Sequence, residues 1–382
     1  MWLSIILWLT MIAFIPYAII ILMYRKWFLQ LKEFVLPQIF QPHIKFSIII
    51  PARNEEKNIA ACLQSIFKQK YSADLYEVIV VDDHSSDNTA NIIKKLQSLH
   101  HNLTLISLAD ELKGEKLNSY KKKAIDIAIQ QSTGEWIITT DADCFVTDQW
   151  LLFYAAMIQQ KNPVFIAAPV KMLDNNDYLS ALQSLDFMVL QGITAASVSA
   201  GFHSMCNGAN LAYKKGVFFE VNGFESINHI ASGDDMLLMN KMKQLYPQQI
   251  GALFAKEAIV STLPMPDWKS FFNQRIRWAS KADHYNDKSI FWVLVVVYFY
   301  NLFLLLLLFY SLFNLIAFQY WCIFLLLKIV VELRFAFPVA KFFDIRLKWW
   351  HILLEPLHII YNVAAGWLGK FGTYQWKERK VK

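Results

Sequence analysis

Ser47-Ile-Ile-Ile-Pro-Ala-Arg-Asn-Glu55 is an apolar run that ends in a polar cluster. The same pattern recurs at Val80-Val-Asp-Asp-His-Ser-Ser-Asp-Asn-Thr89, and a third apolar run ends in Thr140-Asp-Ala-Asp-Cys144. Runs rich in Val and Ile predict buried strands, and segments with helical spacing separate them. This alternation predicts a mostly parallel sheet covered on both faces. Because such sheets bind ligands beyond the carboxyl ends of their strands, we expect the polar clusters to form a site there.

The alternation extends over residues 44–282. Segments with period-two or continuous apolar character predict strands at Lys45–Ile50, Glu77–Val81, Leu103–Ser107, Trp136–Thr140 and Val164–Val170. Segments with a period near 3.6 residues predict helices at Glu56–Lys68, Asn88–Leu99, Tyr120–Gln131 and Asp148–Gln160.

The composition indicates that part of the chain lies in lipid. Of 382 residues, 55% are apolar and only 18% are charged, and the mean hydropathy is +0.30. Soluble proteins carry about 25% charged residues. The net charge of +6 comes from basic residues beside apolar segments, which favours an anionic membrane surface over nucleic acid. The four cysteines have no CxxC spacing and are interpreted as reduced, mostly buried thiols of a cytoplasmic domain.

Residues 1–24 carry no charge and are followed at once by Arg25 and Lys26. About 20 apolar residues suffice to cross a bilayer, so we predict an N-terminal transmembrane anchor. A cleaved signal peptide would need a positive start and a small-residue cleavage site, and this segment has neither. The basic residues after the anchor predict that the next domain lies in the cytoplasm.

The C-terminal part contains further apolar segments. We predict one membrane helix at Ile290–Ser311 and a second at Gln319–Pro338. A third stretch, Trp349–Leu368, includes His351, Glu355 and His358. The basic residues after it favour the cytoplasmic side, so an interfacial or re-entrant helix is preferred to a third span.

Lys328 and Glu332 lie within the second of these helices, four residues apart and therefore on one helix face. Charges at membrane depth are costly and usually face protein or water. They would either mark a polar passage or acceptor site or lie at the interface, with their ends reaching toward water. We favour the interface.

Asp141 and Asp143 alternate after a predicted buried strand, so both carboxylates can point the same way. Two such charges about 4 Å apart repel by about 4 kcal/mol at an effective dielectric near 20. A divalent cation removes this cost, and oxygen ligands favour Mg²⁺ or Mn²⁺. The alternative is a solvated acidic turn.

Two other pairs of acidic residues have a structural and a functional interpretation. Asp82 and Asp83 can accept hydrogen bonds from the base or ribose of a nucleotide, while nearby Ser86 or Asp87 caps the next helix. Asp234 and Asp235 open an amphipathic helix, where a carboxylate acts as a cap or as a general base.

Gln274, Arg277 and Trp278 share one helix face close to the predicted membrane region. Arginine suits phosphate, and tryptophan suits stacking on a sugar or closing a pocket. The alternative is a basic and aromatic helix at the membrane interface.

Together and in this order, the motifs resemble those of the membrane-bound family 2 glycosyltransferases, which include cellulose, hyaluronan and poly-N-acetylglucosamine synthases and ceramide glucosyltransferases. The resemblance covers residues 44–282 and extends to the membrane layout. It implies an α/β fold, with a Rossmann-like GT-A nucleotide-sugar-binding domain and a mostly parallel sheet, flanked by N- and C-terminal transmembrane helices. The implied organisation is an anchor at 1–24, the GT-A domain at 44–282, a membrane region at 289–370 and a basic tail at 371–382. The membrane region has two spans plus an interfacial or third spanning helix.

The resemblance also assigns roles to residues. Lys121 matches the lysine of a stretch in which Asp126 replaces the usual Asn and Ala128 the usual Gly. Asp235 matches the catalytic base, and Asp141 and Asp143 match the Asp-x-Asp that binds Mg²⁺ or Mn²⁺. The implied donor-binding residues are Pro51, Arg53, Glu55, Asp82, Asp83, Lys121, Asp141, Gln274, Arg277 and Trp278. The implied acceptor-side residues are Asn207, Gly208 and Asp234.

The activity implied is inverting, metal-dependent transfer of a sugar from a nucleotide sugar, with UDP expected, to a hydroxyl of a lipid or other membrane-associated acceptor. Its partners would be the donor, a lipid or saccharide acceptor and membrane lipids, with no nucleic acid. The expected location is the bacterial inner membrane with the catalytic domain in the cytoplasm.

Three other interpretations remain. A processive polysaccharide synthase of the poly-N-acetylglucosamine or hyaluronan type has the same motifs, but two or three C-terminal segments are few for a polymer channel. A membrane protein that binds nucleotide sugar without turnover would not need all the carboxylates. A transporter would leave the Asp-rich domain unexplained.

Overall fold

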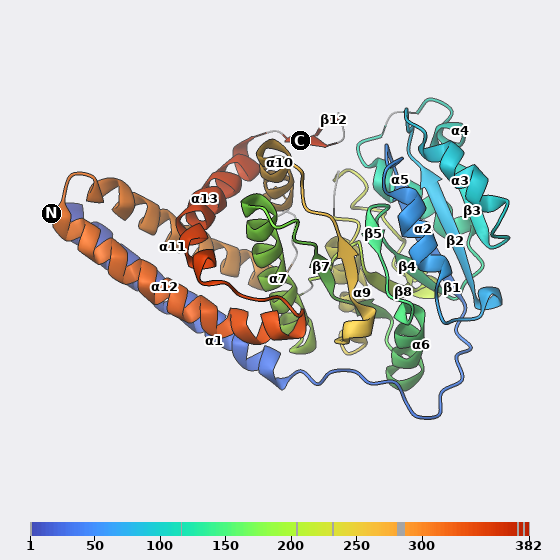
Figure 1. Cartoon of the computed structure of the whole chain (residues 1–382), viewed down its shortest axis with the longest axis horizontal. Coiled ribbons are helices and arrows are strands. Elements are labelled where there is room, and N and C mark those ends of the chain that lie inside the picture. Colours follow the sequence, from blue (N-terminus) through green and yellow to red (C-terminus); the bar gives the residue numbers. More distant parts are fainter. Residues whose placement is uncertain are drawn as a thin grey trace. The chain divides into compact units, whose positions relative to one another are not determined.

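The structure is a computed structural model that describes residues 2–115, 117–203, 205–230, 233–280, 287–372, 374–376 and 379–381. The chain forms two compact units, and its course is drawn in Figure 1. The sheet unit consists of Lys32–Leu173 and Ser197–Leu263. The helical unit consists of Met1–Leu31, Asp174–Ala196 and Pro264–Lys382.

A seven-stranded sheet with the order β3-β2-β1-β4-β8-β6-β9 forms the framework of the sheet unit. β1 to β4 run parallel, β8 runs antiparallel to both of its neighbours, and β9 is parallel to β6. These strands are β1 Phe46–Ala52, β2 Tyr76–Asp82, β3 Leu103–Ser107, β4 Trp136–Thr139, β6 Phe165–Ala167, β8 Leu211–Lys214 and β9 Ile250–Ala252. A small second sheet contains β5 Cys144–Phe145, β10 Val260–Thr262 and β7 Val170–Met172, in that order.

Helices and strands alternate as the apolar pattern predicts. The helices of the sheet unit are α2 Ile59–Phe67, α3 Thr89–Gln97, α4 Leu108–Leu112, α5 Tyr120–Gln131, α6 Trp150–Lys161, α8 Lys215–Glu220 and α9 Met236–Leu245, with 3₁₀ turns at Ala73–Leu75 and Lys256–Ala258. The core joins fully buried strand residues such as Ile49 and Ile137 to the buried face of α5, which includes Ala124 and Ala128. The predicted α/β fold with a mostly parallel sheet is confirmed.

One predicted strand is wrong in its extent. Val164–Val170 was expected to be continuous, but it divides into β6 and β7, which belong to different sheets. Pro169 lies at the break and has no N–H to donate to a ladder. Its carbonyl oxygen instead accepts from the Asn210 side chain (2.7 Å) and from the backbone N–H of Val260 (3.1 Å).

The helical unit contains α1 Trp2–Gln30, α7 Tyr178–Ser199, α10 Trp268–Ala279, α11 Lys288–Ser311, α12 Leu315–Phe342, a 3₁₀ turn at Trp349–Leu354 and α13 Glu355–Phe371. α7 continues to Ser199, while the contacts of the chain change unit after Ala196. α1 packs against α11 and α12, and α13 packs against α10 and α11. Two short strands, β11 Tyr374–Trp376 and β12 Arg379–Val381, pair within the predicted basic tail. Within this tail, Thr373, Lys377, Glu378 and Lys382 lie outside the described part.

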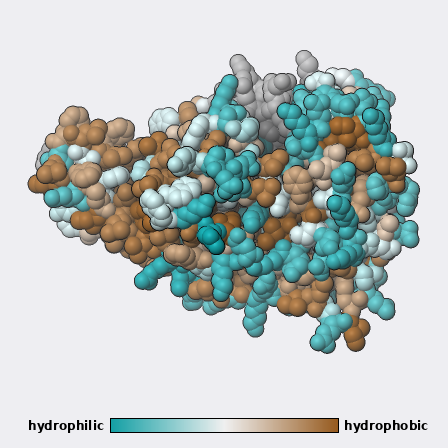
Figure 2. Space-filling model, viewed as in Figure 1, coloured by the Kyte–Doolittle hydropathy of each residue, from teal (hydrophilic) through white to brown (hydrophobic). Residues whose placement is uncertain are grey.

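Three segments of the described chain are long and apolar enough to cross a membrane: Trp2–Gln30, Lys288–Ser311 and Trp349–Phe371. Their outward side chains are large and hydrophobic, as at Trp8 on α1 and Phe309 on α11. Figure 2 shows hydrophobic residues gathered over the part of the helical unit formed by α1, α11 and α12. Helix α1 continues past Arg25 and Lys26 to Gln30 and so extends beyond the predicted anchor at 1–24.

The C-terminal helices bear on two sequence predictions. The predicted second span, Gln319–Pro338, lies within α12 and stays a prediction, while Trp349–Phe371 contains the stretch predicted to be interfacial or re-entrant and is long and apolar enough to cross. Lys328 was expected at an interface, but its side chain is fully buried and its Nζ lies 2.7 Å from Glu332 Oε1. A charge with no exposed surface does not reach toward water, so the interfacial interpretation is wrong.

The predicted domain at 44–282 includes residues of both compact units. α7 and α10 lie within that range, yet their contacts assign them to the helical unit. Apolar residues explain this assignment, since Leu179 and Leu182 of α7 share a buried cluster with Phe271 of α10 and Tyr361 of α13. Residues 281–286, which include the predicted end of the domain, lie outside the described part.

Candidate active site

The strand register brings the polar clusters to one edge of the sheet. Ala52 at the end of β1 pairs with Asp82 at the end of β2, so Asp82 and Asp83 follow the same edge as Arg53. On the other side of β1, Thr139 at the end of β4 pairs with Ile49, and Asp141 follows two residues later. The parallel arrangement thus gathers these side chains beyond the carboxyl ends of three adjacent strands.

Arg53 and Asp83 form the first part of the site. Arg53 Nη1 donates to the carbonyl oxygen of Asp83 (2.9 Å) and lies 3.9 Å from Asp83 Oδ1. Asp83 Oδ1 also lies 2.9 Å from Nδ1 of His84, a residue held at a φ of 55°. Left-handed backbone costs a non-glycine residue about 1–2 kcal/mol, so the surrounding contacts must maintain this turn.

The loop after β1 is fastened to the loop after β2. Asn54 N donates to Ser85 Oγ (2.9 Å), and Ser86 N donates to Asn54 Oδ1 (2.9 Å). Glu55 N donates to Thr89 Oγ1 (2.8 Å), while the Glu55 carboxylate accepts from Asn58. Pro51 lies on β1 opposite Val81, beyond the end of the β4 pairing, where a missing N–H leaves no partner on β4 unsatisfied.

Asp82 Oδ1 is buried and has no hydrogen-bond partner within the described residues. A buried acceptor without a partner costs about 1–3 kcal/mol, so this oxygen is suited to accept from a ligand. That geometry agrees with the role that the resemblance implies for Asp82.

Lys121 joins the second part of the site. Its Nζ lies 2.7 Å from Asp141 Oδ1 and 3.3 Å from Asp234 Oδ2, although these residues lie on α5, after β4 and before α9. Burial acts to lower the pKa of Lys121, but the carboxylates of Asp141, Asp234 and Asp235 outweigh it and raise the pKa above its usual value. Lys121 is therefore a fixed ammonium that holds the acidic residues together.

Asp235 is oriented by two backbone N–H groups. Its Oδ1 accepts from Met236 N (2.7 Å) at the start of α9, and its Oδ2 accepts from Gly208 N (3.3 Å). Gly208 is itself held by β4, because Thr139 Oγ1 donates to its carbonyl oxygen (2.8 Å). Asn207 Oδ1 accepts from Ala209 N (2.9 Å), which shapes the turn at Gly208. The predicted acceptor-side residues thus lie against the predicted base.

Sequence reasoning missed two buried residues that support this arrangement. Lys122 is 2% exposed, and its Nζ donates to the carbonyl oxygens of Ile227 (2.6 Å) and Ile230 (2.7 Å) in the segment that precedes Asp234. Asn210 is fully buried and links Trp150, Tyr154, Pro169 and Ala258. Lys122 stands in a run of three lysines, a pattern that normally predicts exposure.

Asp143 lies beside buried thiols. The Cys144 thiol is 3.8 Å from Asp143 Oδ1, and the Cys62 thiol is 3.7 Å from the Asp141 carbonyl oxygen. Burial, with Asp143 as the next contribution, raises the pKa of the Cys62 thiol. Both thiols are free and buried, as the sequence predicts.

The carboxylates of the site suit a hard divalent cation. Asp141, Asp234 and Asp235 face the Lys121 ammonium, and Asp143 follows Asp141 by two residues, so acidic groups outnumber the cation that they share. Carboxylate oxygens are the ligands that Mg²⁺ and Mn²⁺ prefer. Among the described residues, a close group of three possible metal ligands occurs elsewhere, at Glu332, Glu355 and His358 of the helical unit.

Gln274, Arg277 and Trp278 lie on α10 of the helical unit. Between them lies Arg275, which sequence reasoning passed over and which is only 5% exposed. Arg275 donates to Gln274 Oε1 (3.0 Å), stacks 4.3 Å from the Trp278 ring and pairs with Asp186 of α7 at 2.7 Å. Nothing in the sequence pattern of α7 indicates that Asp186 has this partner.

Two family models match the chain. Glycosyl transferase family 2 matches residues 47–218, and Glycosyl transferase family group 2 matches residues 136–337. These ranges contain the acidic clusters described above, and the second also contains α10 and most of α12. The fold and the models together define a glycosyltransferase with the GT-A fold. The chain belongs to glycosyl transferase family 2.

Curated relatives and a solved structure agree with this. The chain is 30% identical over 190 residues to glycosyltransferase AglE of Haloferax volcanii, which covers 50% of this chain and 58% of the relative. It is 24% identical over 239 residues to the poly-beta-1,6-N-acetyl-D-glucosamine synthase of Staphylococcus epidermidis, covering 61% and 53%. The chain therefore spans little more than half the length of these relatives. A mannosyltransferase from Pyrobaculum calidifontis, in complex with GDP-Man and Mn²⁺, shares the fold with a TM-score of 0.60 at 18% identity over 95% of this chain and 98% of that one.

Proposed function

We propose that this protein transfers a sugar, with inversion, from a nucleotide sugar to a hydroxyl of a lipid or other membrane-associated acceptor. The observation that carries the proposal is the cluster in which Lys121 contacts Asp141 and Asp234 while Gly208 holds Asp235. A family 2 domain supplies the class of reaction. Three segments suited to a membrane support an acceptor that is itself in the membrane.

In this proposal the two loops at the sheet edge bind the nucleotide. The unpartnered Oδ1 of Asp82 and the Asp83 carboxylate accept hydrogen bonds from the base or ribose, while Arg53 keeps Asp83 in place. Pro51 and Glu55 shape the same loop, and UDP is the proposed nucleotide. On α10, Arg277 would pair with the phosphates, and Gln274 and Trp278 would close the donor side.

Asp235 is the proposed general base. Backbone N–H groups hold both of its oxygens, so the carboxylate is oriented before the acceptor arrives. Asp235 takes the proton of the acceptor hydroxyl, whose oxygen forms a bond to the anomeric carbon. The bond from that carbon to the diphosphate breaks on the opposite face, and the nucleoside diphosphate leaves with the electron pair. When bound to Asp141 and Asp143, Mg²⁺ or Mn²⁺ supplies neutralisation of the diphosphate charge.

The test uses the full-length protein in detergent with a panel of UDP- and GDP-sugars, Mn²⁺ and a lipid acceptor, scored by nucleoside diphosphate release and by product size. We expect one donor to turn over, and EDTA to abolish the release. Asp235→Asn should bind the donor but lower kcat by about 10²–10⁴-fold, because a general base contributes that much to rate.

Asp74→Asn is the matched control, since Asp74 is exposed in a 3₁₀ turn of the same unit and should retain full activity. Full activity of Asp235→Asn would remove the base assignment. Absence of nucleotide release with every donor would remove the proposed function. Long polymers on a sizing gel would instead indicate a processive synthase.

A further inference from the structure

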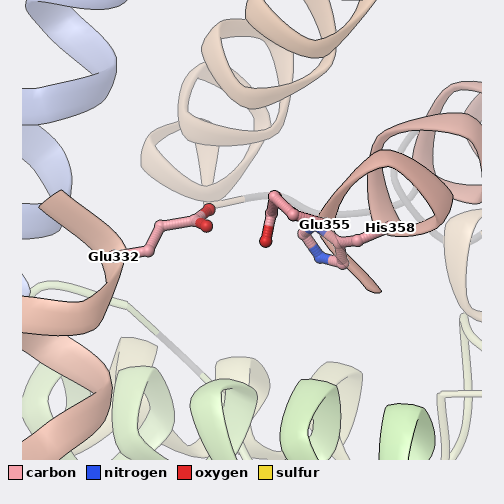
Figure 3. A group of neighbouring side chains, drawn as sticks. All are labelled: Glu332, Glu355 and His358. Carbon is pink, nitrogen blue, oxygen red and sulfur yellow. The ribbon is translucent and has the colours of Figure 1, made fainter. Parts of the chain in front are cut away.

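The helical unit contains a chain of charged side chains that the proposed chemistry does not use. Lys328 Nζ contacts both Glu332 and Glu355, and Glu355 Oε1 lies 3.3 Å from His358 Nδ1. Figure 3 shows the Glu332 carboxylate of α12 directed toward Glu355 and His358 of α13. These groups meet inside a bundle of apolar helices, where an unpaired charge is expensive.

The chain of contacts continues to α10. His358 Nε2 lies 3.7 Å from Asp186 Oδ1, and the other carboxylate oxygen of Asp186 lies 2.7 Å from Arg275 Nη2. The sequence of contacts is thus Arg275, Asp186, His358, Glu355, Lys328 and Glu332, with basic and acidic groups in alternation. We call this set the charge network. It joins α10, α7, α13 and α12 within one unit.

A metal ion does not explain the group of possible ligands at Glu332, Glu355 and His358, which lie within 4.8 Å of one another. The Lys328 ammonium contacts both glutamates and so already supplies the positive charge at that point. A divalent cation would have to displace a buried lysine that has no exposed surface. The group is better described as one end of the charge network.

The other end of the network contacts α10 through Arg275. Arg275 is held between the Phe271 ring (4.8 Å) and the Trp278 ring (4.3 Å), and it donates to Gln274. A second contact to α7 lies just before α10. There Gln183 Oε1 accepts from Met265 N (2.8 Å), and Gln183 Nε2 donates to the Met265 carbonyl oxygen (3.0 Å). Gln183 and Asp186 are three residues apart on one face of α7. Two contacts from the same face of α7 therefore add to the packing of α10 against α13.

We propose that Asp186 and His358 are positioning residues that fix α10 through Arg275 and thereby orient Gln274 and Trp278 for the reaction. The inference rests on the proposed function, since it assigns these α10 residues to the donor side. Asp186 and His358 touch no reacting group in this proposal. They act by restricting the Arg275 side chain through the 2.7 Å ion pair between Asp186 Oδ2 and Arg275 Nη2.

The test measures two quantities in detergent-solubilised full-length Asp186→Asn: donor kinetics, and hydrogen exchange of the α10 amides. We expect kcat to fall about 10- to 100-fold with the donor KM within about twofold, because a misplaced side chain chiefly weakens the stabilisation of the transition state. Exchange of the α10 amides should accelerate. Asp186→Glu keeps the carboxylate and should recover part of kcat.

Glu332→Gln is the matched control, because it neutralises an acid at the far end of the same network. It should lower the unfolding temperature but leave kcat within about twofold and α10 exchange unchanged. Unchanged α10 exchange in Asp186→Asn would overturn the inference, as would equal losses of kcat in both variants in proportion to their stability. If the wild-type protein turns over no donor, the proposed function fails, while the exchange data still decide whether Asp186 positions α10.

Discussion

At the scale of single residues, the site depends on the close approach of Gly208 to the acidic cluster. A Cβ at Gly208 would lie 3.3 Å from Asp234 Oδ2, 3.5 Å from Lys121 Nζ and 3.8 Å from Asp235 Cβ. Any side chain there would occupy the space between the shared ammonium and the proposed base. These short distances explain why the turn at position 208 is occupied by a glycine.

We predict that Gly208→Ala lowers kcat by about 10- to 100-fold, because an added methyl group displaces Asp235 or Asp234 from a defined geometry. Stability should change little, since the neighbouring groups shift by only a few tenths of an ångström. Gly216→Ala is the control, because a Cβ at Gly216 would meet no atom within 4 Å. Steady-state kinetics and thermal unfolding of the two variants check the prediction, and equal kcat values would contradict it.

Asp186 predicts a pH dependence of stability. Burial acts to raise its pKa, but Arg275, His358 and Tyr361 together outweigh burial and lower the pKa to about 2 from an ordinary value of 3.8. The folded state therefore favours the carboxylate, which contributes stability above about pH 4 and loses that contribution as the pH falls from about 4 to 2. The loss is of the order of 2 kcal/mol.

Thermal unfolding of the solubilised protein between pH 5 and pH 2 measures this loss. Other carboxylates titrate in the same window, so the informative quantity is the difference between the wild type and Asp186→Asn. We expect the wild type to lose more stability than the variant over this range. Parallel curves for the two proteins would show that Asp186 does not carry the effect.

At the scale of elements, α5 connects the core to the site through adjacent lysines with different partners. Lys121 faces the carboxylates, whereas Lys122 is buried and holds the segment that contains Ile227 and Ile230. The two residues point in different directions because successive helix positions differ by about 100°. One turn of α5 therefore holds both the Lys121 ammonium of the site and the chain segment that leads to Asp234.

We predict that Lys122→Met destabilises the protein and lowers kcat about tenfold. The substitution removes two hydrogen bonds from a charged donor to the carbonyl oxygens of Ile227 and Ile230, each worth about 1.5–3 kcal/mol. Limited proteolysis near Ile227 should become faster than in the wild type. Lys123→Met is the control on the same helix, because Lys123 is partly exposed and pairs only loosely with Asp126 at 3.9 Å. Equal rates of proteolysis in the two variants would show that Lys122 does not hold the segment around Ile227 in place.

At the scale of the whole molecule, the proposed orientation places the sheet unit in the cytoplasm of a bacterial cell, with the helical unit in the inner membrane. Arg25 and Lys26 near the end of α1 support this, because basic residues concentrate on the cytoplasmic side. We predict that protease cleaves the sheet unit in inside-out membrane vesicles and spares it in right-side-out vesicles. The reverse pattern would contradict the orientation, and loss of the protein from the membrane in alkaline carbonate would contradict the anchor.

The sequence by itself determined the elements whose cause is local. Apolar runs such as Ile48–Ile50 predict buried strands, and the polar residues after them, such as Asp82 and Asp141, lie at the carboxyl ends of strands as predicted. The resemblance to family 2 also followed from the order of short motifs. These features are readable because each depends on neighbours along the chain.

The tertiary structure alone decided which charges meet. Lys121 contacts Asp234, and Arg275 contacts Asp186, across long separations in sequence. The assignment of α7 and α10 to the helical unit likewise depends on apolar contacts with α13. The physical reason is that burial of a charge is tolerated only beside a specific partner, and a linear pattern does not say which distant residue packing will place there.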